Sequence, residues 1–320
     1  MMVTILILYS PTNGSSILFS DEKYRTAYEV LYSAASQQGA VFCRAPFSWY
    51  NQKKKSFDQA WFFENNQWIL KSHVTPNIIY DKTVYEAVPK DMYTELAQQF
   101  PFVNDPEFNR VASSKYATSV LLPQYFKPYY RVANRQELAE VAKSITGKLI
   151  VAKPEFGSGG KEVFIDTPQA ISERELQYPL LLQEFIDSSH GIPGITPGYH
   201  DLRLVFINEE LIYSYIRIPK SGSLLANIAQ GGTMEIIERD ILPISLQPLT
   251  QAVRNAFKHF PRKIYTIDVL FDENARPWIV ELNTMPGIYF SPGQEATRDH
   301  FYKKLTQALL DSQNTWQKRS

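Results

Sequence analysis

The stretch Tyr265-Thr-Ile-Asp-Val-Leu-Phe-Asp-Glu-Asn-Ala-Arg-Pro-Trp-Ile-Val-Glu-Leu-Asn-Thr-Met-Pro-Gly287 predicts two antiparallel strands joined by a turn. A fold-back centred near Asn274 and Ala275 places Asp268 opposite Glu281. Side chains alternate along a strand. We therefore expect one mostly polar face, made of Thr266, Asp268, Ile279, Glu281 and Asn283. We expect the other face to be core, made of Tyr265, Ile267, Val269, Phe271, Trp278, Val280 and Leu282.

The facing carboxylates of Asp268 and Glu281 require a cation between them. Directly opposed residues have Cβ atoms about 4.5–5.5 Å apart, and like charges there destabilise a sheet. Together with Asn283 they offer oxygen ligands without His or Cys, which suits a hard cation such as Mg²⁺, with Mn²⁺ as an alternative. The competing interpretation is a solvated face that carries two acids by chance.

The composition is that of an ordinary globular protein. The chain has 320 residues, 44% of them hydrophobic, which allows two or three modules with sizeable cores. Lys plus Arg and Asp plus Glu are both 33, so bulk charge gives no support to binding of nucleic acid or a membrane. Cys43 is the only cysteine, which excludes an intrachain disulfide and favours a cytoplasmic location. The apolar start at 3–9 is too short to span a bilayer and does not have the pattern of a signal peptide.

The first third of the chain predicts a βαβ unit. A strand at 3–9, a helix at about 21–38 and a strand at 40–43 follow one another. In open α/β sheets, the loop after the first strand is where ligands bind, so 13–16 is either a substrate contact or a plain turn. We interpret 46–110 as aromatic-rich and irregular, with one further strand at 77–80 and a boundary near 100–106.

The rest of the chain alternates strands with capped helices. We expect Ser113 to cap a short helix that carries Lys115, and Asn134 with Glu137 to form a capping box. The expected strands are 149–154, 162–165, 180–186, 202–207 and 211–218. A polar segment at 219–233 precedes a helix that Ser245 caps and whose apolar stripe is core, and a closing helix covers about 295–311.

The loop Pro154-Glu-Phe-Gly-Ser-Gly-Gly-Lys-Glu162 is glycine-rich and joins two expected strands. It is neither a Walker A motif nor a dinucleotide fingerprint. Its glycines have unhindered N–H groups that can close over phosphate oxygens, and Lys153 would add a positive charge. Taken alone, a glycine-rich hairpin is more often a flexible turn than a nucleotide site.

Charged residues interrupt two of the later strands. Asp201 and Arg203 share one face of the first strand, and Arg217 interrupts the next. Such residues are rarely buried without a partner. The arginines therefore either form salt bridges or bind an anion, and the sequence leaves both readings open.

The order of these motifs carries more information than any one of them. Lys115, Lys153 before Gly157-Ser-Gly-Gly160, Gln183-Glu-Phe-Ile186, Asp201-Leu-Arg203, Arg217, Asn227, Asp268 and Glu281-Leu-Asn-Thr-Met-Pro-Gly287 occur in succession. Over roughly 110–295 this order resembles the ATP-grasp superfamily, in particular the branch of glutathione synthetase and the ribosomal-protein glutamate ligase. The final motif carries most of the resemblance.

The resemblance implies a role for each matching residue. It implies that Lys115 and Lys153 bind the α- and β-phosphates of ATP. The implied lid over the triphosphate is Gly157, Ser158, Gly159, Gly160 and Lys161, and the implied adenine hinge is Gln183, Glu184, Phe185 and Ile186. Asp268, Glu281 and Asn283 match the Mg²⁺ ligands, while Arg203, Arg217 and Asn227 match contacts to the γ-phosphate and an acyl phosphate.

The segment beyond the hinge departs from the family pattern, and Asp187 is the candidate for the ribose. His190 and His200 are interpreted as loop residues rather than catalysts.

The implied fold is an ATP-grasp fold of the α+β and α/β type, with two α+β lobes enclosing ATP. A small Rossmann-like βαβ domain precedes it, giving domains at 1–110, 111–190 and 191–320. The implied activity is an ATP-dependent carboxylate–amine ligase that forms an acyl phosphate and releases ADP and phosphate. An ATP-grasp kinase and a catalytically inactive nucleotide-binding regulator are the alternatives. We expect small-molecule or peptide substrates selected by 1–110 and 219–233. Homodimers are common among such ligases, but no motif predicts an interface.

Overall fold

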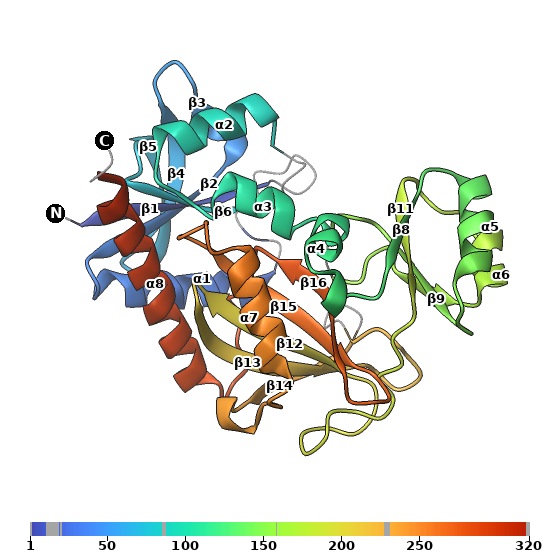
Figure 1. Cartoon of the computed structure of the whole chain (residues 1–320). Coiled ribbons are helices and arrows are strands. Elements are labelled where there is room, and N and C mark those ends of the chain that lie inside the picture. The colour runs from blue at the N-terminus through green and yellow to red at the C-terminus, as the bar shows by residue number, and fades with distance from the viewer. Residues whose placement is uncertain are drawn as a thin grey trace.

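The structure is a computed structural model that describes residues 2–10, 19, 21–84, 88–157, 159–226 and 231–317. Its strands form three sheets, of seven, four and five strands. Figure 1 shows the four-stranded sheet set apart on the side away from the N-terminal sheet, with the five-stranded sheet below and between them. Each sheet lies within one of the three segments expected to be domains, although α3 (Pro106–Ala112) spans the boundary proposed after residue 110.

The N-terminal sheet confirms the βαβ unit. Its elements are β1 (Val3–Tyr9), α1 (Glu22–Ser36), β2 (Ala40–Pro46), η2 (Phe47–Trp49), β3 (Tyr50–Asn51), β4 (Ser56–Glu64), β5 (Gln67–Val74), β6 (Ile78–Lys82), α2 (Lys90–Gln99) and β7 (Phe102–Val103). The strand order is β3-β4-β2-β1-β6-β7, with β5 paired to β4. β1 lies between β2 and β6 and is parallel to both.

The interpretation of 46–110 as irregular is wrong. β4 and β5 form a long antiparallel hairpin in this segment. Its turn is made by Asn65 and Asn66, both with positive φ, 50° and 62°. Two-residue hairpin turns prefer Asn or Gly at such positions, so the Asn pair was the signal that could have revealed the hairpin.

The four-stranded sheet is antiparallel in the order β10-β9-β11-β8. Its elements are α4 (Lys115–Leu121), η4 (Pro123–Tyr125), β8 (Tyr129–Val132), α5 (Arg135–Ser144), β9 (Ile150–Lys153), β10 (Phe164–Asp166), α6 (Pro168–Glu173) and β11 (Leu180–Glu184). Asn134 caps α5 by accepting from the Glu137 N–H, as predicted, and the Glu137 carboxylate accepts from the Ala133 N–H. The cap of α4 is Ser114 rather than Ser113, because it is the Ser114 hydroxyl that accepts from the Ala117 N–H.

The five-stranded sheet is antiparallel in the order β14-β13-β12-β15-β16. Its elements are β12 (Asp201–Ile207), β13 (Glu210–Ile218), β14 (Thr233–Ile237), η6 (Arg239–Ile241), α7 (Leu246–Ala256), β15 (Ile264–Phe271) and β16 (Pro277–Asn283), followed by α8 (Glu295–Gln317). The apolar stripe of α7 packs against one face of this sheet, as predicted. Ser245 occupies the N-cap position of α7, but its side chain makes no capping bond.

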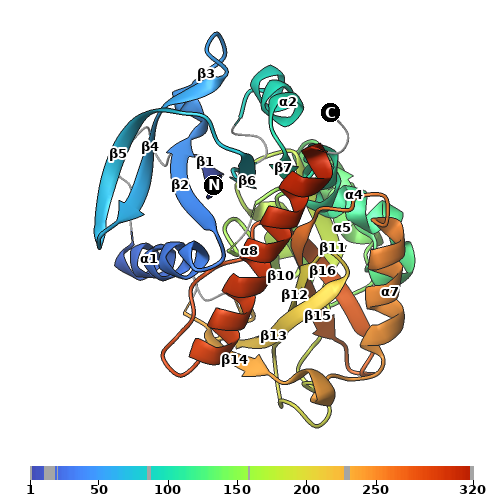
Figure 2. The same ribbon diagram turned by 90° about the vertical axis from the view of Figure 1, so that its left-hand side faces the viewer.

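α8 joins the N-terminal sheet to the five-stranded sheet. Its buried residues Phe301, Tyr302, Leu305 and Leu309 share a core with α1, β1, β6, β12 and β13. The Tyr302 hydroxyl donates to the Ala27 carbonyl of α1 and to the Ile288 carbonyl after β16. Figure 2 shows α8 crossing the molecule between these parts. The N-terminal sheet is thus packed against the lobe that carries the acidic hairpin.

The hairpin of β15 and β16 has the predicted register, with Asp268 paired to Glu281. A bulge directly beyond this pair then matches Val269 with Ile279, so that Val280 has no partner. The extra residue reverses the faces predicted for the start of β16. Ile279 therefore lies in the core, and Val280 faces the cleft described below.

Candidate functional site

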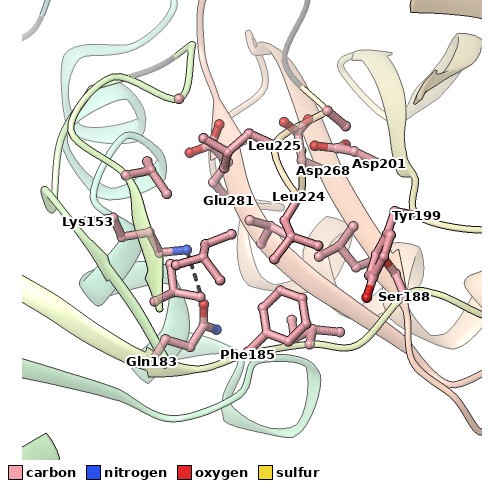
Figure 3. Close-up of a pocket in the computed structure, with 18 of the residues that line it drawn as sticks. Lys153, Gln183, Phe185, Ser188, Tyr199, Asp201, Leu224, Leu225, Asp268 and Glu281 are labelled. Carbon is pink, nitrogen blue, oxygen red and sulfur yellow. Dashed lines mark hydrogen bonds between the residues drawn. The ribbon is translucent and has the colours of Figure 1, made fainter. Parts of the chain in front are cut away.

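A cleft lies between the four-stranded and five-stranded sheets, and both supply its walls (Figure 3). From the four-stranded sheet come Val151, Lys153, Ile165 and Gln183, and from the five-stranded sheet come Asp201, Asp268, Leu270, Val280 and Glu281. The connection between the sheets contributes Phe185, Ile186, Ser188, Tyr199 and His200. The loop before β14 contributes Leu224, Leu225 and Ala226.

The cleft has an apolar part and a charged end. Aliphatic and aromatic side chains from both sheets and the loop line most of it: Val151, Val163, Ile165, Phe185, Ile186, Leu224, Leu225, Leu270 and Val280. Figure 3 shows Phe185 and Gln183 at one end and the carboxylates of Asp268 and Glu281 at the other. A flat apolar group with a charged tail fits this division.

Lys153 lies between the two parts of the cleft. Only 4% of it is exposed, and its ammonium donates to the Gln183 side-chain oxygen at 3.1 Å (Figure 3). The same ammonium lies 4.7 Å from the centre of the Tyr129 ring. Burial, and next the charge of Lys115, lower the pKa of Lys153 to about 7. No carboxylate pairs directly with this ammonium among the described residues, so it can bind an anion.

Lys115 links the acidic hairpin to the glycine-rich loop. Its ammonium lies 3.1 Å from a Glu281 carboxylate oxygen and donates to the Gly157 carbonyl at 2.9 Å. Gly157, Gly159 and Gly160 have φ of 112°, 75° and 71°, values that side chains other than glycine rarely adopt. The glycines are therefore required by the shape of the β9–β10 turn.

Arg203 and Arg217, both singled out from the sequence, contact the acidic hairpin at Asp268. Arg203 contacts both carboxylate oxygens of Asp268 from the neighbouring strand. Arg217 contacts Asp268 at 2.6 Å and Asp201 at 2.5 Å. Both arginines thus form salt bridges, one of the two readings that the sequence left open. Both arginines are bonded to Asp268, which lines the charged end of the cleft.

The three acids at the charged end of the cleft differ in the direction of their pKa shifts. Burial raises the pKa of Asp268, but Arg203 and then Arg217 outweigh it and bring the pKa below its ordinary value. Burial also acts on Glu281, where Lys115 outweighs it and lowers the pKa. For Asp201 burial prevails over Arg217, so its pKa is raised. Asp268 and Glu281 therefore keep their negative charge, and the protein supplies the cations that their pairing requires.

A divalent metal fits the donor set. Asp268, Glu281 and Asn283 supply only oxygen ligands, because the Asn283 amide nitrogen donates to Glu281 and leaves its oxygen available. Each carboxylate oxygen has two lone pairs, so it can bind an arginine or lysine and a metal together. The described part of the chain contains no group of three or more His, Cys, Asp or Glu that could hold a metal ion.

The comparisons with known proteins identify the family. A model of the RimK-like ATP-grasp domain matches residues 125–297, more than half of the chain. The chain belongs to the RimK-like ATP-grasp family. This confirms the resemblance drawn from the motif order.

Individual relatives are distant. A glutathione synthetase from Prochlorococcus marinus subsp. pastoris is 35% identical over 95 residues, which cover 27% of this chain and 28% of that protein. A probable alpha-L-glutamate ligase from Hydrogenovibrio crunogenus is 26% identical over 158 residues, 48% of each chain. The chain therefore spans less than half the length of these curated relatives.

Solved structures match the chain over nearly its whole length. D-alanyl-alanine synthetase A from Vibrio cholerae has a TM-score of 0.67 at 14% identity and covers 98% of both chains. A RimK domain protein from Sphaerobacter thermophilus has a TM-score of 0.63 at 14% identity and covers 96% of this chain and 100% of that one. At such identities the matches show the fold alone. They confirm the ATP-grasp fold with its N-terminal α/β domain.

Most of the residues singled out by the ATP-grasp resemblance lie together at the cleft. Those that line the cleft are Lys115, Lys153, Gly160, Gln183, Phe185, Ile186, Asp268 and Glu281. Those that contact them directly are Gly157, Arg203, Arg217 and Asn283. Ser158, Asn227 and the segment 13–16 lie outside the described residues.

Several predicted residues do not line this cleft. Lys161 is exposed, and Gly159 is not among the lining residues. Glu184 forms a salt bridge with Lys127 at 3.1 Å. Asp187 is exposed and lines an adjoining cavity that shares Phe185, Ile186 and Tyr199 with the cleft. A role for Asp187 at a ribose stays a prediction.

His200 lies in the loop directly before β12, as predicted, and it also lines the cleft wall. It is 2% exposed, its Nε2 accepts from the Phe271 N–H at 3.1 Å, and its Nδ1 lies 3.1 Å from the Gly198 carbonyl. Burial lowers its pKa, so the ring is neutral and holds β15 beside the connection from β11. Ser188 and Tyr199 were missed because no pattern marks 188–199 as part of a site.

Proposed function

We propose that this protein is an ATP-dependent ligase that joins a carboxylate to an amine and releases ADP and phosphate. The observation that carries the proposal is a cleft whose apolar part adjoins Lys115, Lys153, Asp268 and Glu281. Arg203 and Arg217 hold Asp268 from the same sheet, and Lys115 holds Glu281. The names of the relatives add support, because a glutathione synthetase and a probable glutamate ligase are among them.

The apolar part is the proposed site of the adenine. The base would lie among aliphatic side chains next to Phe185, with the hinge after β11 offering backbone groups to its edge. Lys153 would then reach the phosphates, since it lies between this part and the charged end. Asp268, Glu281 and Asn283 would hold Mg²⁺, which when bound neutralises phosphate charge.

The proposed reaction needs positioning and charge neutralisation more than a reactive side chain. A carboxylate oxygen of the acid attacks the γ-phosphorus and ADP leaves, which gives an acyl phosphate. The amine then attacks the acyl carbon, the bond to the phosphate oxygen breaks, and the departing phosphate takes the proton that the amine loses. Arg203 and Arg217 are placed to stabilise the transferred group. Cys43 is buried in the N-terminal sheet and takes no part.

The lid and the loop before β14 would exclude water from the acyl phosphate. The loop contributes Leu224, Leu225 and Ala226 to the cleft, and the lid is tied to Lys115 through Gly157. Exclusion of water protects a reactive intermediate from hydrolysis. Among the described residues, no helix has the length and apolar character needed to cross a membrane.

The test is product analysis with ATP, Mg²⁺ and a panel of amino acids, short peptides and polyamines. A ligase releases phosphate only when both the acid and the amine are present. Transfer of the γ-phosphate to a hydroxyl with no free phosphate would instead identify a kinase. Binding of ATP without turnover across the panel would identify a regulator.

A further inference from the structure

A second set of cations lies in the N-terminal sheet, outside the cleft. Arg44 is on β2 and is only 7% exposed. Its guanidinium carbon lies 4.4, 4.1 and 4.7 Å from the ring centres of Tyr9, Phe19 and Tyr28. Its Nε and Nη1 atoms are buried without a hydrogen-bond partner, and no salt bridge with a carboxylate is found for it in the described parts of the chain.

Aromatic rings satisfy only part of what a buried guanidinium needs. They attract the cation through the faces of the rings, but they accept few of its five N–H groups. Buried N–H groups without an acceptor are costly, and more so when they carry charge. Tyr9 also shares a side-chain hydrogen bond with Arg44, but Nε and Nη1 still lack an acceptor, which an anion would supply.

Lys82 lies at the same edge of the sheet. It ends β6, it faces the same side as Tyr80, and its ammonium donates to the Pro286 carbonyl at 2.6 Å. Burial, and next the charge of Arg44, lower its pKa to about 8. The neighbouring Asp81 points to the other side of the strand, where Tyr93, Thr83 and Asn109 hold its carboxylate. The carboxylate next to Lys82 in the chain is thus already hydrogen-bonded.

Arg44 and Lys82 flank the central strand β1. Ile7 of β1 pairs with Arg44 and Tyr9 with Lys82, so the two cations project from strands roughly 10 Å apart. β1 pairs with β2 on one side and with β6 on the other. The chain therefore continues first to one side of β1 and later to the other, and the end of β1 is a topological switch point. Open parallel sheets bind ligands at the carboxyl ends of strands at such a point. Figure 2 shows α1, which carries Tyr28, packed beneath β1 and β2.

This edge faces the acidic hairpin of the ATP cleft. Pro286, the partner of Lys82, comes three residues after Asn283. Tyr24 precedes Tyr28 by one turn of α1, and a Cβ built at Gly287, four residues after Asn283, would lie 3.6 Å from the Tyr24 hydroxyl. The segment that follows the acidic hairpin therefore runs beside the edge that carries Arg44 and Lys82.

We propose that Arg44, with Lys82 beside it, binds a second, non-reacting carboxylate of a substrate. The inference rests on the proposed ligase function and makes the substrate class an acid or amino acid that carries an additional carboxylate. One guanidinium and one ammonium already bound to a carbonyl match a single negative charge better than a phosphate dianion. The reacting end of the substrate would then lie at Arg203 and the ATP phosphates.

The first experiment measures binding without turnover. The full-length protein is titrated calorimetrically with succinate and glutarate and, as matched monocarboxylates, with butyrate and valerate. We expect the dicarboxylates to bind more tightly to the wild type, and Arg44→Met to weaken this binding roughly 30-fold or more. Arg135→Met, which changes an exposed arginine on α5, is the control and leaves binding unchanged. Equal binding of both acid classes, or tighter binding of inorganic phosphate than of the dicarboxylates, overturns the proposal.

The second experiment uses turnover. With an acid and amine that support phosphate release, Arg44→Met should raise the KM for the acid and leave the KM for ATP unchanged, whereas Arg44→Lys should rescue part of the acid KM. An unchanged acid KM overturns the inference while the ligase function stands. Absence of phosphate release with every acid overturns the ligase function, and the calorimetric comparison still decides about Arg44.

The melting temperature separates ligand binding from a structural role. Met fills the space between aromatic rings and leaves no unsatisfied buried donors, so Arg44→Met should fold with a melting temperature close to that of the wild type. A large loss of stability together with unchanged dicarboxylate binding would show that Arg44 serves only to hold the three rings together. Lys82→Met then gives an independent variant, for which weaker dicarboxylate binding is expected and unchanged binding counts against the site.

Discussion

Asp268 and Glu281 are paired directly across β15 and β16, but each carboxylate is held by a different set of cations. Arg203 and Arg217 contact Asp268, whereas Lys115 contacts Glu281. The first set comes from the same sheet, and Lys115 comes from α4 and also contacts the glycine-rich loop at Gly157. The two acids are therefore expected to respond differently to substitution.

Glu281→Gln should reduce ATP turnover roughly 100-fold or more, because it removes a ligand of the proposed metal, whose neutralisation of phosphate charge contributes several kcal/mol to transition-state stabilisation. The same change releases Lys115 from its carboxylate and thereby disturbs the glycine-rich loop. Phosphate release is measured with the acid and amine that support it in the wild type. Glu140→Gln on the exposed side of α5 is the matched control. Turnover within threefold of the wild type would remove Glu281 from the proposed metal site.

Asp268→Asn should lose stability as well as turnover. Asp268 is 1% exposed, and its removal leaves Arg203 and Arg217 buried with less negative charge to balance them. Breaking such a buried pair costs about 3–5 kcal/mol. Urea unfolding measures the change.

The control for Asp268→Asn is Glu107→Gln, since Glu107 forms an exposed ion pair with Arg110. Such surface pairs contribute little, so its free energy of unfolding should change by less than about 0.5 kcal/mol. Equal unfolding midpoints for the two variants would mean that the arginines find other partners without Asp268.

The register of the acidic hairpin was predictable because a turn-rich segment lies between two apolar runs. The faces of β16 were not, since the bulge at Val280 inserts one residue into a run that is apolar on both sides of it. A pattern of apolar residues alone does not mark such an insertion. The ATP-grasp resemblance supplied the order of the motifs, and the structure supplied their contacts.

The salt bridges of Arg203 and Arg217 illustrate what a single sequence leaves undetermined. Strand alternation placed Asp201 and Arg203 on one face, as observed. Whether the arginines pair with acids depends on which strands are neighbours, and β12 lies between β13 and β15 although these are far apart in the chain. Arg44 was missed for a related reason, because its aromatic neighbours come from β1, the segment before α1, and α1 itself.

Lys153 should take up a proton when ATP binds. Burial and the charge of Lys115 lower its pKa to about 7, and adjacent phosphates raise it. Below about pH 7 the lysine is already charged and the affinity for ATP does not depend on it; as the pH rises above 7, affinity falls because protonation must accompany binding. At pH 8 most of the Lys153 side chains carry no proton before ATP binds, so net uptake of a proton on binding is expected.

The uptake is measured by calorimetry in two buffers that differ in ionisation enthalpy. Lys153→Arg keeps the positive charge but does not titrate in this range, so its binding heats should be equal in the two buffers. Identical proton uptake by Lys153→Arg and the wild type would assign the proton to another group.

Gly232→Ala should weaken ATP binding through the loop before β14. A Cβ at this position would lie 2.5 Å from the Ala226 carbonyl oxygen and 3.0 Å from that of Ile218. Both atoms belong to the backbone, so the chain must move, and Leu225 and Ala226 move with it away from the cleft that they line. Overpacking of this kind costs about 1–3 kcal/mol, which corresponds to a roughly 5- to 150-fold loss of ATP affinity if the whole cost falls on the nucleotide-binding position of the loop.

Gly222→Ala is the control, because no atom lies within 4 Å of its Cβ and only its φ of 81° is strained. That variant should lose stability but keep its affinity for ATP, and equal ATP affinities for the two variants would show that this loop does not form part of the nucleotide site.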